Sequence, residues 1–68
     1  MRAASNDNAP RLIAAKDAAE MTSLSRQLLS AMAAEGLFPQ PVKLGKMRVA
    51  YVRAEVEAWI DKKIAQRG

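Results

Sequence analysis

The chain has 68 residues, a length that allows one small domain. Half of its residues are apolar, which supports a folded core, and its net charge of +4 gives a pI near 10.0. Because it contains no cysteine and no histidine, disulfides, thiolate or imidazole metal sites and catalysis by either residue are excluded. We therefore expect no cofactor, and the lack of an apolar run near the ~18 residues of a membrane span predicts no membrane contact.

Residues 1–10 are polar and rich in Ala, Asn and Ser, and they show no helical or strand periodicity. This composition predicts a disordered N-terminal tail and leaves residues 11–68 for the folded domain. Arg11-Leu12-Ile13 opens that domain with a short apolar segment. The segment fits either a brief strand or a staple onto the first helix.

A first helix is predicted over Lys16–Met21, with small residues on its inner face that let a second helix approach closely. It must end by Ser23, because Thr22 and Ser23 are weak helix formers. We expect Ser23 to take the left-handed conformation after the helix, at a cost of about 1 kcal/mol relative to Gly.

Ser25 is a good N-cap for a second helix over Arg26–Glu35. Helical spacing predicts that one face, with the residue before the cap, packs in the core, namely Leu24, Leu29, Met32 and Ala33. The opposite face carries Gln27, Ser30, Ala31 and Ala34. Gly36 is expected to end the helix in a Schellman motif, with Leu37 folding back on Met32.

Two prolines keep Phe38–Pro41 extended. Beyond them, Val42–Leu44 and Arg48–Tyr51 are predicted strands, joined by a turn at Gly45–Met47. The hairpin and the two residues that follow it contain four cations and no acid. Such a stripe is typical of a phosphate-binding surface, although charge alone fits a solvated strand edge protected by Lys and Arg equally well.

A third helix is predicted from Arg53 to about Ala65 or beyond. Its apolar stripe consists of Val56, Trp59, Ile60 and Ile64. The start of this helix is poorly capped, because Val52 has no side-chain acceptor. As the largest apolar side chain, Trp59 is expected to anchor the whole core.

These elements predict a fold that is mainly α with a small β-hairpin: a winged helix-turn-helix of three helices plus a wing. In such a fold the start of the second helix reaches base edges, and the wing lies beside it. Arg can bond guanine and Gln adenine through two hydrogen bonds, whereas Ser hydroxyls and free helix-start amides suit phosphate. The candidate DNA-binding residues are Ser23, Ser25, Arg26, Gln27, Ser30, Lys43, Lys46 and Arg48.

The same residues have a plainer interpretation as an ordinary capped helix and a surface turn that aids solubility. The basic hairpin directly after the two helices favours DNA binding over this alternative, and Met47 is unusual in a turn that serves only solubility. An enzyme has less support, because the carboxylates are scattered, no Gly-rich phosphate loop exists and the core is too small for a deep pocket.

Several segments of the chain resemble one known family. They are Arg11-Leu12-Ile13, Lys16-Asp17, Leu24-Ser25-Arg26, Glu35-Gly36-Leu37-Phe38-Pro39, Pro41-Val42-Lys43-Leu44-Gly45 and Glu55-Val56-Glu57-Ala58-Trp59-Ile60. Together, over about residues 11–65, they resemble the AlpA-like family of small phage and mobile-element regulators, which belongs with the excisionase-like, MerR-related winged helices. The chain departs from its relatives at Ser23, where Gly is common, and at Ser30 and Ala31, where larger polar or aromatic residues are frequent.

The resemblance implies a sequence-specific protein that binds double-stranded DNA of a prophage or integrative element, in the cytoplasm at the nucleoid. It implies an excisionase, or recombination directionality factor, that binds repeated sites and bends DNA so that an integrase favours excision. The small residues at the departures put more weight on phosphate contact and DNA shape, and hence on self-association of several copies on DNA. An AlpA-type transcriptional regulator is the close alternative, and a small protein-interaction module without DNA binding is the alternative from another class.

Overall fold

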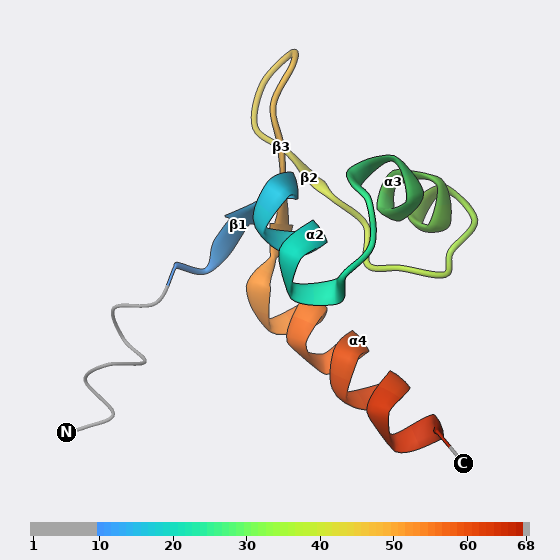
Figure 1. Cartoon of the computed structure of the whole chain (residues 1–68). Helices are drawn as coiled ribbons and strands as arrows, with labels where there is room; N and C mark the ends of the chain where they lie inside the picture. The colour runs from blue at the N-terminus through green and yellow to red at the C-terminus, as the bar shows by residue number, and fades with distance from the viewer. Residues whose placement is uncertain (1–9, 68) are drawn as a thin grey trace, which may run out of the picture.

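The computed structural model describes residues 10–67, so the predicted tail lies outside the described residues except for Pro10. Helices and strands follow one another along this part of the chain (Figure 1). They are β1 (Leu12–Ala14), α2 (Ala15–Thr22), α3 (Arg26–Ala34), β2 (Val42–Lys43), β3 (Val49–Val52) and α4 (Arg53–Gln66). The three predicted helices are confirmed, with ends close to the expected residues.

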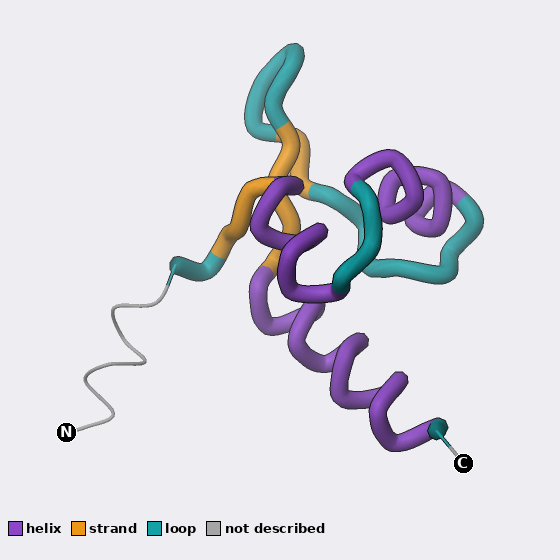
Figure 2. The backbone as a smooth tube through the Cα atoms, in the orientation of Figure 1, coloured by secondary structure: helices purple, strands orange, loops and turns teal. Residues whose placement is uncertain are grey.

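The strands form one antiparallel sheet in the order β1-β3-β2 (Figure 2). The predicted hairpin is confirmed, with Lys43 opposite Val49. On the other side of β3, β1 pairs with Ile13 opposite Tyr51. The apolar opening of the domain is therefore a strand, and the sheet is one strand larger than the hairpin that the sequence predicts.

The added strand also compensates for the poor cap of α4. As predicted, Val52 offers no side-chain acceptor at the start of this helix. The Arg53 amide instead donates to the Arg11 carbonyl at 2.8 Å, which satisfies one of the amides that a helix start leaves free. One turn later, the Arg53 guanidinium pairs with the Glu57 carboxylate at 3.1 Å, although an exposed pair of this kind contributes little to stability.

The turn between α2 and α3 has the expected left-handed residue. Ser23 has a φ of 64°. Just before it, the Thr22 hydroxyl donates to the Ala18 carbonyl at 2.9 Å and accepts from the Leu24 amide at 3.3 Å. These bonds fix the chain as it leaves α2, so the direction of α3 is set by local hydrogen bonds as well as by packing.

We expect Ser23→Gly to stabilise the fold by about 0.5–1 kcal/mol, because Gly occupies the left-handed region without the steric cost of a β-carbon. The greater freedom of Gly in the unfolded chain offsets part of the gain. The measurement is the urea midpoint of unfolding at an unchanged slope. Ser23→Ala keeps the β-carbon and should bring no gain; an equal gain from both variants would mean that backbone strain is not the cause.

The end of α3 is the predicted Schellman motif. Gly36 has a φ of 79°, its amide donates to the Ala33 carbonyl at 3.0 Å, and the Leu37 amide donates to the Met32 carbonyl at 2.8 Å. The Leu37 side chain stays 57% exposed. The motif therefore redirects the backbone toward Phe38 rather than adding Leu37 to the core.

Leu29 of α3 and Val56 of α4 are the largest fully buried side chains of the core. Phe38 is buried in the same cluster, and its ring meets Tyr51 and Trp59 edge-on, with ring centroids 5.3 and 5.0 Å apart. Trp59 is only partly buried, and its indole Nε1 donates to the Leu37 carbonyl at 2.9 Å. The expectation that Trp59 anchors the whole core is wrong: Phe38 takes the inner position and Trp59 covers its edge.

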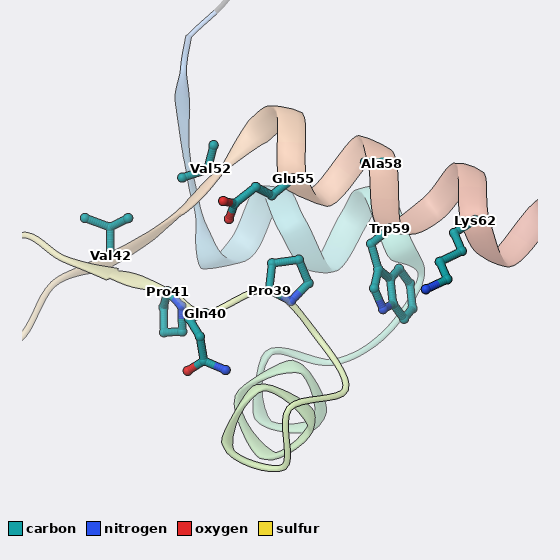
Figure 3. Close-up of a pocket in the computed structure, with 9 residues that line it drawn as sticks. All are labelled: Pro39, Gln40, Pro41, Val42, Val52, Glu55, Ala58, Trp59 and Lys62. Carbon is teal, nitrogen blue, oxygen red and sulfur yellow. The ribbon is translucent and has the colours of Figure 1, made fainter.

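The wing, formed by β2, β3 and the loop at residues 44–48, projects from the body of the molecule. In Figure 1 it extends upward while α4 runs down, and in Figure 3, seen from another side, β2 and β3 lead left while α4 runs right. Both views show α3 and α4 on opposite sides of the segment at residues 39–41. This arrangement of helix pair, wing and third helix is the predicted winged helix-turn-helix.

Candidate nucleic-acid interface

The start of α3 is capped, polar and exposed. The Ser25 hydroxyl oxygen accepts from the Leu28 amide at 3.0 Å, which confirms the predicted N-cap. The next two side chains, Arg26 and Gln27, are exposed, as is Ser23 in the turn. Because the first amides of a helix have no acceptor within the helix, those of Arg26 and Gln27 add positive potential beside these side chains.

The outward face of α3 lies opposite its contact with α2. Leu29 and Ala33 are buried on the inner face. The residues on the other side are exposed, as their spacing predicts: Gln27, Ser30, Ala31 and Ala34. Ser30 lies at the border of this face, so the Ser30 hydroxyl is further from the centre of the face than the Gln27 side-chain amide is.

The wing carries three exposed cations. Lys43 is in β2, whereas Lys46 and Arg48 are in the loop. Within residues 10–67, none of the three has an acidic ion-pair partner, in contrast to Arg53 on α4. Met47, between two of them, is 93% exposed. The loop is closed by the Leu44 amide, which donates to the Arg48 carbonyl at 2.9 Å.

The wing and α3 occupy the same part of the molecule. Both lie in the upper part of Figure 1, and the C-terminal end of α4 lies far below them. A surface groove runs between α2 and the start of α3, lined in part by Lys16, Glu20, Arg26 and Gln27. The structure therefore brings the helix-start candidates together and presents the wing cations on a neighbouring projection, separate from the cations at the end of α4.

A family model described as prophage CP4-57 regulatory protein (AlpA) matches residues 11–64. The chain belongs to the AlpA family. The resemblance predicted from the sequence segments is thereby confirmed over nearly the whole of the described chain. Comparison with curated proteins and with solved structures found no significant match.

Membership in the AlpA family assigns the chain to a class of phage DNA-binding regulators rather than to a class of enzymes. The phenol of Tyr51 lies in the core, and burial raises its pKa above the ordinary value. It therefore serves packing against Phe38 rather than proton transfer at a surface. No helix within residues 10–67 is both long and apolar enough to cross a membrane.

A second groove, absent from the sequence predictions, lies between the segment at residues 39–42 and α4 (Figure 3). Pro39, Pro41 and Trp59 form part of its apolar lining, and the lining also includes two charged residues, Glu55 and Lys62. Its walls come from segments far apart in the chain, so no local signal could have predicted it. None of the candidate DNA-binding residues lines it.

Proposed function

We propose that this AlpA-family protein binds duplex DNA sequence-specifically, with α3 in the major groove and the wing on the adjacent minor groove or backbone. One observation carries most of the proposal. The capped start of α3 and a wing with three exposed cations lie in the same part of the molecule, away from the end of α4 (Figure 1). A double helix laid across them would meet hydrogen-bond donors at one contact and positive charge at the other.

In this proposal the residues divide into two roles. Arg26 donates two hydrogen bonds to guanine, and Gln27 bonds adenine through its amide. The other candidates contact phosphates through a hydroxyl group or a positive charge and so fix the position of the protein on the DNA. They are Ser23, Ser25, Ser30, Lys43, Lys46 and Arg48. The Ser25 oxygen accepts the Leu28 amide, and its O–H stays available to donate to a phosphate oxygen, which can only accept.

The biological role that we propose is that of an excisionase, or recombination directionality factor. The nine residues of α3 and their few long polar side chains provide little direct base readout, which favours several copies bound side by side on repeated sites. Bending of the DNA between them would add specificity through DNA deformability. The protein partner is then an integrase of the same mobile element, and both proteins act on DNA in the cytoplasm.

A transcriptional regulator of AlpA type is the second candidate, and the description of the matching family as a regulatory protein favours it. The two roles use the same residues and differ in their outcome in the cell. Deletion of the protein should abolish excision without changing integrase mRNA if it acts directly as a directionality factor. A parallel fall in integrase mRNA would identify the regulator instead.

The DNA-binding proposal itself is tested by titrating the full chain into duplex DNA at several salt concentrations. The logarithm of the affinity should fall linearly with the logarithm of the salt concentration, with a slope of about −0.9 for each phosphate contact. Binding that is absent, or that is independent of salt, would contradict the proposal. It would instead favour a small protein-interaction module.

Arg26→Ala is expected to weaken specific binding by about 1–3 kcal/mol and to relax the preference at one base pair. The physical reason is that the alanine side chain cannot form the two hydrogen bonds that the guanidinium makes to guanine. Competition with duplexes substituted at each position measures both effects. Lys16→Ala, at the same groove, should leave the base preference intact; an Arg26→Ala variant with unchanged affinity and specificity would remove Arg26 from the site.

A further inference from the structure

The centre of the outward face of α3 is almost free of hydrogen-bonding groups. Since Leu29 and Ala33 are buried in the core and successive helical residues are turned by about 100°, the outermost line of the helix runs through Gln27 and Ala31. Both are exposed, as is Ala34 one turn further along. One amide is therefore followed by two methyl groups on the line that would lie deepest in a DNA groove.

Methyl groups on this line have two physical consequences. First, Ala is small, so the backbone of α3 can approach base edges more closely than a helix with long side chains. Second, Ala31 cannot form a hydrogen bond to a base through its side chain. The apolar feature that the major groove offers is the 5-methyl group of thymine. Leu28, which is 45% exposed at the border of the same face, extends the apolar surface.

We propose that α3 recognises thymine through contact of its 5-methyl group with Ala31, next to an adenine that is bonded by Gln27. This inference rests on the proposed DNA binding and specifies the base that the site takes. Residues four apart on a helix lie one above the other, so Gln27 and Ala31 face neighbouring base pairs. Ala31 is thus a specificity-determining residue, although it carries no polar atom in its side chain.

The experiment separates the methyl group from the rest of the base. The tightest-binding duplex is first selected from a random-sequence library with the full chain, and each thymine is then replaced singly by deoxyuridine, which lacks only the 5-methyl group. We expect a three- to fivefold loss of affinity, about the contribution of one buried methyl-sized group, at one or two positions and no loss at the others. Those positions should adjoin an adenine at which Gln27→Ala relaxes the preference.

Two matched variants link the effect to the helix. Ala31→Gly removes the side-chain methyl group itself and should abolish the sensitivity to deoxyuridine. Ala65→Gly makes the same change at an exposed position near the end of α4 and should preserve it. Circular dichroism checks that both variants keep the fold.

Any of the following results would overturn the inference. A selected site without thymine, or a wild-type protein insensitive to deoxyuridine at every position, excludes methyl recognition while leaving specific DNA binding intact. Undiminished sensitivity in Ala31→Gly assigns the contact to another residue. Selection that yields no preferred duplex contradicts both this inference and the proposed function.

Discussion

Phe38→Ala is expected to lower the free energy of unfolding by about 3–5 kcal/mol. Phe38 is 3% exposed and its ring touches both Tyr51 and Trp59, so truncation removes two aromatic contacts and leaves a cavity. A domain of this size lies near the lower end of the usual range of about 5–15 kcal/mol. The variant should therefore retain only about 0–2 kcal/mol and unfold at a much lower urea concentration than the wild type. Urea unfolding followed by circular dichroism and by the fluorescence of the single tryptophan measures the change.

Leu37→Ala is the matched control for this core prediction. The residue is the immediate neighbour of Phe38, but its side chain is 57% exposed, and its carbonyl remains available to the Trp59 indole. We expect a change within about 0.5 kcal/mol. A normal unfolding curve for Phe38→Ala, or an equal loss in the control, would show that the aromatic cluster does not lie at the centre of the core.

The double variant Lys46→Ala/Arg48→Ala should bind DNA much more weakly than the wild type. Each lost phosphate contact lowers the slope of log affinity against log salt by about 0.9, which corresponds to roughly eightfold at 0.1 M salt. Two contacts together predict a slope smaller by about two and an affinity lower by roughly 60-fold. The measurement is a salt titration of binding to one duplex, with the fold of the exposed wing variant checked by circular dichroism.

Lys62→Ala/Arg67→Ala removes the same charge from exposed positions near the end of α4, far from the wing in Figure 1. It should leave the slope nearly unchanged, because only long-range attraction is weakened and salt screens that attraction within about 10 Å at 0.1 M. If the two double variants lower the slope equally, general positive charge rather than the wing accounts for binding.

The features that the sequence predicted well depend on a few neighbouring residues. The left-handed Ser23, the Ser25 cap and the Gly36 ending are each set by local stereochemistry and hydrogen bonding. The helical faces followed from spacing alone. With 3.6 residues per turn, Leu29 and Gln27 lie on opposite faces of the helix, and the first is buried and the second exposed. The winged helix-turn-helix could therefore be predicted before any contact was known.

The features that the sequence missed depend on contacts between distant segments. Two prolines reveal that the backbone at Phe38 is extended, but they do not reveal on which side the ring lies. The sequence left the segment at Leu12 and Ile13 open between a brief strand and a staple, and only its pairing with β3 decides for the strand. Trp59 was assigned the centre of the core from its size, whereas its indole N–H has a carbonyl acceptor at the rim, as is usual for a residue with one polar atom.

We propose that the start of α3 and the wing form one DNA-binding face, and two-dimensional ¹⁵N–¹H NMR of the full chain, titrated with a selected duplex, tests this most directly. We expect the amide signals of residues 23–30 and 43–48 to shift together at the same DNA concentration, while those of residues 62–66 change little. Shifts confined to the end of α4, or a wing that responds without α3, would contradict it.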